Sequence, residues 1–123
     1  MKYLGIDYGE KKIGLSLAED FLAEPLGVIK ARNWQLKIKE ICQKYEIEKI
    51  VLGISEGKTA LKTKIFGQKL AKVCQLPVEF YDETLTSHDA LAKMREIGKK
   101  TSQEDAFAAT VILQNYLDNK KNV

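Results

Sequence analysis

The sequence predicts an α/β fold in which a mixed five-stranded sheet carries helices on both faces. Three short apolar segments follow one another closely at the start of the chain, and strands so close in sequence pair as antiparallel neighbours. After them, strand patterns alternate with helical patterns, which predicts β-α units that add parallel strands to the same sheet. The length of 123 residues suits one domain, so residues 1–123 are expected to form a single domain.

The first part of the chain predicts an antiparallel three-strand meander. Residues 2–7 and 12–18 have strand composition, and a short glycine-containing turn at residues 8–11 joins them. A third strand is expected over residues 26–30, directly after Pro25. The first helix should follow this meander at once.

Two helices and a strand are predicted next. Asn33 is expected to cap the first helix, whose apolar residues recur at helical spacing: Trp34, Ile38, Ile41, Cys42 and Tyr45. Residues 49–54 form a continuous apolar run, which is typical of a strand covered on both faces. Thr59 is expected to cap a second helix with its own apolar stripe: Leu61, Ile65, Phe66, Leu70 and Val73.

The last third of the chain predicts one strand and two helices. Pro77 precedes a short strand from Val78 to Tyr81. Thr86 and Asp89 form a capping box for a helix that ends at Gly98. A second capping box, formed by Ser102 and Asp105, opens a last helix that reaches about Asp118 and is apolar nearly all round over residues 106–113.

Composition narrows the possible classes of protein. Lys and Arg outnumber Asp and Glu by 20 to 17, a mild excess that is compatible with nucleic acid but is shared by many proteins that do not bind it. No secretory start and no run of about 20 apolar residues is present, so we expect a cytoplasmic protein. Cys42 and Cys74 are expected to be free thiols in a reducing compartment. The single histidine, His88, leaves only a hard cation held by carboxylates as a candidate metal.

Acidic residues lie where several predicted strands end. Asp7 ends the first strand, Glu56 follows the fourth, and Asp82 and Glu83 follow the fifth, while Asp105 lies in the first turn of the last helix. Helix-covered α/β sheets bind ligands at the carboxyl ends of their strands. Carboxylates bind Mg²⁺ or Mn²⁺, and such ions activate water for phosphodiester cleavage. The pattern therefore predicts a metal-dependent phosphodiester hydrolase, with the membership of Glu56 and Asp82 left open.

Each of these acids also has an ordinary structural interpretation. Asp7 could be a turn residue, although an unpaired charge after a buried strand is costly and favours a ligand. Asp105 could only cap its helix, and Glu83 could be a loop acid. Glu56 is more typical of a turn, and His88 of an exposed residue in a first helical turn.

Several lysines are candidates for contacts to phosphate groups. Lys11, Lys12 and Lys58 fall in predicted loops near the strand ends. Lysines at the edge of an acidic site would supply the electrostatic part of nucleic-acid binding. Their ordinary interpretation is a solvated surface, and the same holds for the lysines at positions 62, 64, 99 and 100.

Three segments resemble the YqgF/RuvX family, whose members are described as Holliday junction resolvases and as pre-16S rRNA nucleases. They are L-G-I-D-Y-G-E-K-K-I-G-L-S-L-A at 4–18, F-Y-D-E-T-L-T-S at 80–87 and E-D-A-F-A-A-T-V-I-L-Q-N-Y-L at 104–117. The resemblance implies an RNase H-like fold, dependence on Mg²⁺ or Mn²⁺, a bacterial cytoplasmic setting and processing of the 5′ end of 16S rRNA in ribosome biogenesis. By position it implies that Asp7, Glu83 and Asp105 are the catalytic metal ligands.

The sequence departs from the family pattern at two places. Thr84 stands where the family usually has Arg, and threonine cannot replace the planar phosphate-binding fork of a guanidinium group. The segment G-I-S-E-G at 53–57 is shorter than the family loop and lacks its proline. Both differences concern the surface that would hold the substrate more than the metal site.

Alternative functions stay open on the sequence alone. A Holliday junction resolvase would use the same chemistry on branched DNA, and a catalytically weakened nucleic-acid-binding module would fit Thr84. A nucleotide-binding phosphotransferase shares the motif G-I-D-x-G, but such proteins need two domains of this size to enclose ATP. The sequence separates neither RNA from DNA, nor one metal ion from two, nor a monomer from a homodimer.

Overall fold

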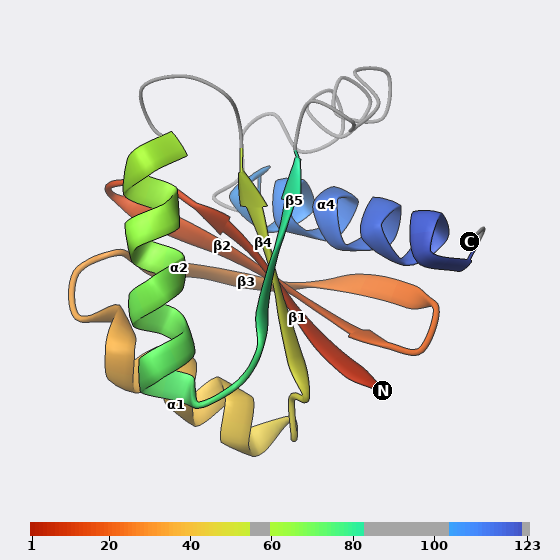
Figure 1. The fold of residues 1–123 in the computed structure, drawn as a ribbon, viewed down its shortest axis with the longest axis horizontal. Coiled ribbons are helices and arrows are strands. Elements are labelled where there is room, and N and C mark those ends of the chain that lie inside the picture. The colour runs from red at the N-terminus through yellow and green to blue at the C-terminus, as the bar shows by residue number, and fades with distance from the viewer. Residues whose placement is uncertain (55–59, 83–103, 122–123) are drawn as a thin grey trace.

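The computed structural model describes residues 1–54, 60–82 and 104–121 of the chain (Figure 1). Its elements are, in order, β1 (Lys2–Tyr8), β2 (Lys12–Glu19), β3 (Leu22–Lys30), α1 (Trp34–Lys44), β4 (Lys49–Ile54), α2 (Ala60–Cys74), β5 (Val78–Asp82) and α4 (Glu104–Lys121). None of the helices in these ranges is long and apolar enough to cross a membrane.

The strands form the predicted mixed five-stranded sheet, in the order β3-β2-β1-β4-β5. β1 pairs antiparallel with β2, and β2 with β3, whereas β1 and β4 pair in parallel, as do β4 and β5. β1 is therefore the central strand. Because β1, β4 and β5 run in the same direction, they end along one edge of the sheet, at Tyr8, Ile54 and Asp82, which we call the carboxyl edge.

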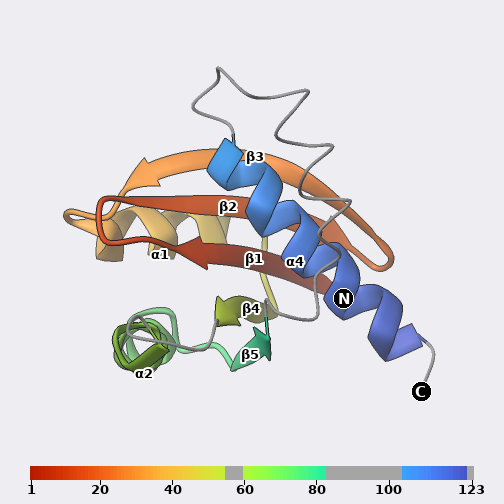
Figure 2. The ribbon, with the colours of Figure 1, turned by 90° about the horizontal axis from the view of Figure 1, so that it is seen from above.

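Helices cover both faces of the sheet, as predicted. α1 and α2 pack on one face through a buried cluster that includes Leu4, Ile6, Ile38, Leu52, Phe66 and Leu70. α4 crosses β1, β2 and β3 on the other face (Figure 2), where a second buried cluster includes Tyr3, Val51, Tyr81, Leu113 and Tyr116. Since strand side chains alternate between faces, even-numbered residues of β1 face α1 and α2, and odd-numbered residues face α4.

The third strand begins at Leu22, earlier than predicted, and Pro25 lies inside it. A tight turn at Asp20, whose backbone is left-handed (φ 64°), reverses the chain directly after β2. β3 is an edge strand of the sheet, where proline's missing N–H breaks no ladder bond on the open side. The pairing with β2 also shifts between Leu15 and Ser16, opposite Pro25, which marks a bulge.

The predicted apolar stripe of α2 was partly wrong. Leu61 is 67% exposed and Ile65 is 44% exposed, whereas Phe66 and Leu70 are buried as expected. Gly67 faces the sheet, and the ring of Phe80 lies where a side chain at this position would stand. Leu61 and Ile65 therefore lie on the outer side of α2.

α1 begins where the sequence predicts, but the predicted side-chain cap at its start is absent. α1 begins after Asn33, but the Asn33 side chain forms no capping hydrogen bond, and its backbone is left-handed (φ 60°), a conformation that asparagine tolerates. α4 runs to Lys121, beyond the predicted end. The predicted cap at Thr59, the helix ending at Gly98 and the cap at Ser102 lie outside the described residues.

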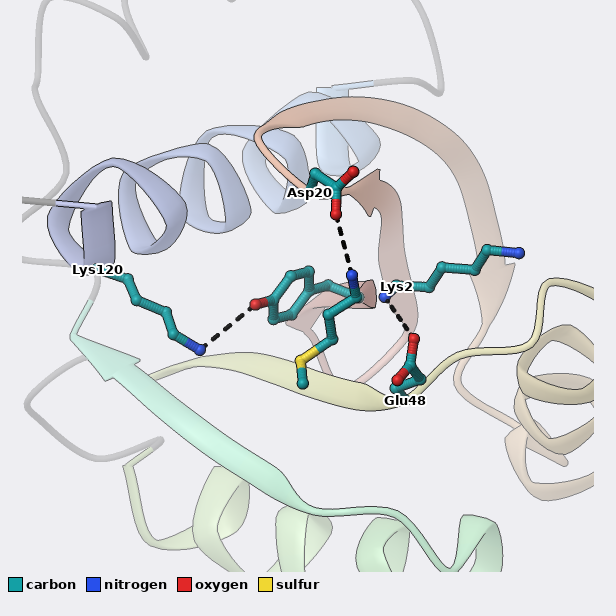
Figure 3. Close-up of polar contacts among 6 residues, drawn as sticks. Lys2, Asp20, Glu48 and Lys120 are labelled. Atoms are coloured by element: carbon teal, nitrogen blue, oxygen red, sulfur yellow. Dashed lines mark hydrogen bonds and ion pairs between the residues drawn. The ribbon is translucent and has the colours of Figure 1, made fainter.

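Polar contacts close the opposite, amino-terminal edge of the sheet (Figure 3). The amino group of Met1 pairs with the carboxylate of Asp20 at 3.0 Å, and the backbone N–H of Lys2 donates to Glu48 at 3.1 Å. Lys120 of α4 donates to the hydroxyl of Tyr3 at 3.4 Å. These contacts tie the start of β1 to its neighbours, so this edge has a structural role.

Candidate functional site at the carboxyl edge

Asp7 lies near the end of the central strand β1 and is half-buried. It is paired across the antiparallel ladder with Gly14 of β2, and it follows Ile6, which is fully buried. Strand alternation gives Asp7 the same face as Tyr3 and Gly5. Asp7 is therefore expected to present its carboxylate on the α4 side of the carboxyl edge.

α4 packs closely against β1 at Gly5. A Cβ atom at Gly5 would collide with the Ser16 hydroxyl and would lie 2.8 Å from the Cβ of Leu113. Ser16, on the neighbouring strand, is completely buried, and its hydroxyl donates a 2.8 Å hydrogen bond to the carbonyl oxygen of Ala109 in α4. The missing side chain of Gly5 allows the helix to approach, and Ser16 fixes its position.

The direction of α4 relative to β1 follows from these contacts. Tyr116 packs edge-on against Tyr3, with ring centroids 6.0 Å apart, near the start of β1. Ala109 and Leu113 lie over Gly5, further along the strand. The helix therefore runs against the direction of β1, and its first turn, one turn before Ala109, is directed toward the carboxyl edge. This turn contains Asp105, whose side chain lies outside the described residues.

Asp82 does not share the face of Asp7. It is the last residue of β5 and is half-buried. Asp82 and Phe80 are two positions apart in β5, so their side chains point to the same face of the sheet. The ring of Phe80 lies against Gly67 of α2. Asp82 therefore belongs to the α1 and α2 side of the sheet, away from α4. Glu83 and Glu56 lie outside the described residues.

Lys11 and Lys12, two of the predicted substrate contacts, lie at the carboxyl edge. Both are exposed, Lys11 in the turn after β1 and Lys12 at the start of β2. The carbonyl oxygen of Lys11 accepts a 2.9 Å hydrogen bond from the backbone N–H of Ala31, which fixes this turn. The other predicted substrate contacts, Lys58 and Thr84, and also His88, lie outside the described residues.

In the part of the chain that the structure describes, no three His, Cys, Asp or Glu side chains lie close enough to hold a metal ion together. Two of the three predicted ligands, the side chains of Glu83 and Asp105, fall outside that part. Asp7 alone supplies carboxylate oxygens of the type that Mg²⁺ and Mn²⁺ prefer. Among the three predicted ligands, the one whose side chain is described is thus chemically suited to a hard divalent ion.

Sequence reasoning missed Gly5 and Ser16, which position α4. A glycine within a strand can indicate a close approach by another backbone, and this feature could have drawn attention to Gly5. Ser16 gave no such indication, because its partner Ala109 is 93 positions away. Both residues act on the site through the placement of α4.

Comparison with known proteins identifies the family. The profile of the RuvX family, described as Holliday junction resolvase, matches residues 1–119. A protein of Anaeromyxobacter sp. (strain Fw109-5) is 36% identical over 135 aligned positions, covering 98% of both chains. A protein of Dechloromonas aromatica (strain RCB) is 37% identical and covers 98% of this chain and 92% of its own. Both bear the name "Putative pre-16S rRNA nuclease".

Solved structures confirm the fold. RuvC of T. thermophilus, in complex with a Holliday junction substrate, superimposes with a TM-score of 0.64 at 16% identity and covers 98% of this chain and 96% of its own. The fowlpox virus resolvase, in complex with Holliday junction DNA, gives a TM-score of 0.65 at 14% identity, covering 98% and 99%. The sheet and its helices therefore form the RNase H-like fold of these proteins. With a family profile that matches nearly all of its length, the chain belongs to the RuvX family.

Proposed function

We propose that this chain is a metal-dependent nuclease that processes the 5′ end of the 16S rRNA precursor. Asp7, Glu83 and Asp105 are the proposed ligands of Mg²⁺ or Mn²⁺. The observation that carries the proposal is the course of α4, which Ser16 and Gly5 hold against β1 so that the turn containing Asp105 is directed toward the edge where Asp7 lies. The names of the relatives support the substrate.

The described residues contribute rigidity and charge to this reaction. A bound Mg²⁺ ion would lower the pKa of a water molecule and stabilise the charge that develops on the cleaved phosphate. Asp7 would hold the ion from the central strand, which is paired on both sides. Lys11 and Lys12, exposed beside it, would contact phosphates of the substrate. Lys58 and Thr84 are proposed as further contacts.

We exclude Asp82 from the proposed site because its side chain, like that of Phe80, points to the α1 and α2 face of the sheet, opposite to Asp7. This provides a matched control, since Asp7 and Asp82 are both half-buried aspartates at the carboxyl edge. Glu83, the next residue in the chain, is kept as the proposed ligand from this segment.

The test is cleavage of an RNA that carries the 16S leader, in the presence of Mg²⁺ or Mn²⁺. Asp7→Asn and Asp105→Asn are each expected to reduce the rate of cleavage by more than about 100-fold. Replacing even a hydrogen-bond partner of a metal ligand typically lowers metal affinity or activity by about 10–100-fold. Asp82→Asn is expected to stay within about threefold of the unmodified protein. Normal RNA binding without cleavage under either ion would contradict the nuclease and favour the catalytically weakened binding module.

A second candidate is the resolution of four-way DNA junctions, which the description of the family model favours. The same ligands would serve, because the bond that breaks is a phosphodiester in both substrates. A synthetic four-way junction and the leader RNA, compared at equal concentration with the same protein, distinguish the two. Faster cleavage of the junction would identify branched DNA, and not the rRNA precursor, as the substrate. The proposed metal ligands would stay the same.

A further inference from the structure

A small pocket beside the end of β1 has the features of a site for a nucleic-acid base. Its volume is about 180 Å³, and we call it the α2 pocket. The pocket lies between the end of β1, the start of α1 and one flank of α2. It is lined by Tyr8, Trp34, Lys62, Ile65, Phe66 and Lys69.

The wall of the α2 pocket is aromatic and fixed. The rings of Tyr8 and Phe66 stack with centroids 4.3 Å apart and planes 23° apart. The ring of Trp34 meets Phe66 edge-on at 4.7 Å. Phe66 and Trp34 are buried in the core, so this wall is held in place before any ligand arrives. Tyr8 is half-buried and is the ring of this wall that a base could reach, and an aromatic ring stacks on bases with little regard to sequence.

The rim of the α2 pocket is cationic. Lys62 and Lys69 line it, and none of its described lining residues is acidic. α2 as a whole carries Lys62, Lys64, Lys69 and Lys72 but no Asp or Glu. Glu10 of the β1–β2 turn pairs with Lys62 and offsets its charge, so Lys69 is the principal cation of the rim.

Two other pockets among the described residues lack this charge pattern. One, of about 410 Å³, has Glu19 and Glu24 in its lining together with lysines. Another, of about 350 Å³, includes Glu79, which pairs with Lys49 at 3.4 Å. Of these three pockets, the α2 pocket alone combines an aromatic wall with a lining that contains no described carboxylate, which suits a flat group attached to an anionic backbone.

We propose that the α2 pocket binds one unpaired base of the substrate strand, next to the nucleotide that is cleaved, while Lys62 and Lys69 contact the adjoining phosphates. The proposal rests on the proposed nuclease function and specifies its substrate. Tyr8 follows Asp7 directly in β1 but points to the opposite face. A strand held at both places must therefore cross the carboxyl edge, which a stiff duplex does less readily than an unpaired strand.

The size of the α2 pocket agrees with a single stacked base. Pockets that enclose small ligands have volumes of about 300–1,000 Å³, so the α2 pocket would not enclose a whole nucleotide. The surface within reach of a base is the half-buried ring of Tyr8, with Ile65 exposed beside it. The sugar and phosphate would stay at the rim with the lysines.

The test is the binding of a labelled single-stranded oligouridine, followed by fluorescence anisotropy in EDTA so that no cleavage occurs. Ile65→Glu is expected to weaken binding on the order of tenfold, because stacking of one base contributes about that much. Lys69→Gln is expected to weaken binding several-fold, because it removes one phosphate contact. Leu61→Glu and Lys72→Gln are the matched controls: they make the same changes at exposed positions of α2 outside the pocket. Both controls should stay within about twofold.

A strand of equal length with abasic sugars separates base binding from charge. The unmodified protein should bind oligouridine about tenfold more tightly than the abasic strand, and Ile65→Glu should lose this preference. Equal binding of the two strands by the unmodified protein would overturn the proposal, as would equal losses in Leu61→Glu and Ile65→Glu. This assay measures binding without catalysis, so its result is independent of the cleavage test. The base-binding proposal can be wrong while the leader RNA is cleaved, and it can be right while the leader RNA is not cleaved.

Discussion

Gly5 and Ser16 form the contact that places α4 on the centre of the sheet. A methyl group at Gly5 would collide with the Ser16 hydroxyl and approach the Ala109 carbonyl oxygen to 3.1 Å. We expect Gly5→Ala to lower the free energy of unfolding by about 1–3 kcal/mol, the usual effect of overpacking a core. Urea denaturation followed by circular dichroism measures this change as a lower midpoint.

Ser16 provides the control for this prediction. Ser16→Ala alone should lower the free energy of unfolding by about 1 kcal/mol, the net contribution of a typical hydrogen bond. In the double variant Gly5→Ala/Ser16→Ala the new methyl group no longer meets the hydroxyl oxygen. The combined loss should therefore be smaller than the sum of the single losses. Strict additivity would show that the two positions do not share this contact.

Cys42 and Cys74 differ in expected reactivity, although both are free thiols as predicted. The two side chains form a hydrogen bond between α1 and α2, which raises the pKa of Cys42 and lowers the pKa of Cys74. The thiolate is the reactive form, so Cys74, which is also the less buried of the two, should be alkylated first. Peptide mass spectrometry after brief iodoacetamide treatment measures both sites, and faster modification of Cys42 would contradict the assignment.

At the scale of elements, Gln114 holds the β2–β3 hairpin against α4. Its side-chain amide donates to the carbonyl oxygen of Phe21 and accepts from the backbone N–H of Ala23, both at 2.9 Å. Gln114→Leu should lower the free energy of unfolding by about 1–2 kcal/mol and speed amide exchange at Ala23. Gln68→Leu, on the exposed side of α2, is the matched control. Unchanged exchange at Ala23 would show that the hairpin is held by other contacts.

Local patterns predicted most elements of this fold. β1, β2, β4 and β5 begin and end within a residue or two of the predicted positions, because apolar runs bounded by turns specify strands locally. β3 was placed too late because Pro25 was taken as its boundary, whereas an edge strand tolerates proline. The outer side of α2 was misjudged because Gly67 packs against Phe80, a partner from another element.

The candidate site was predictable only in part, because its supports are distant in sequence. Asp7 could be found from its position at a strand end, and the structure places it at the end of the central strand. Ser16 looked like an ordinary strand residue until its bond to Ala109 showed how α4 is held. Asp82 and Glu83 are adjacent in sequence, so only strand pairing could show that Asp82 belongs to the opposite face.

At the scale of the whole molecule, the lysines of α2 predict how nucleic-acid binding responds to salt. Each phosphate contact adds about −0.7 to the slope of log K against log salt for a single strand. Lys69→Gln should therefore make this slope less negative by about that amount, while Lys72→Gln should leave it unchanged. Anisotropy titrations of oligouridine at several potassium chloride concentrations measure the slope. Equal slopes for all three proteins would contradict a phosphate contact at Lys69.

The central claim is that Asp7, Glu83 and Asp105 hold a divalent ion at the carboxyl edge. A crystal structure of the protein soaked in Mn²⁺, with anomalous scattering recorded for manganese, tests it most directly. The account predicts an anomalous peak within about 2.0–2.2 Å of carboxylate oxygens from all three residues, as hard divalent ions require, with Asp82 turned away. A peak that Asp7 does not contact, or well-ordered carboxylates with no peak among them, would contradict it.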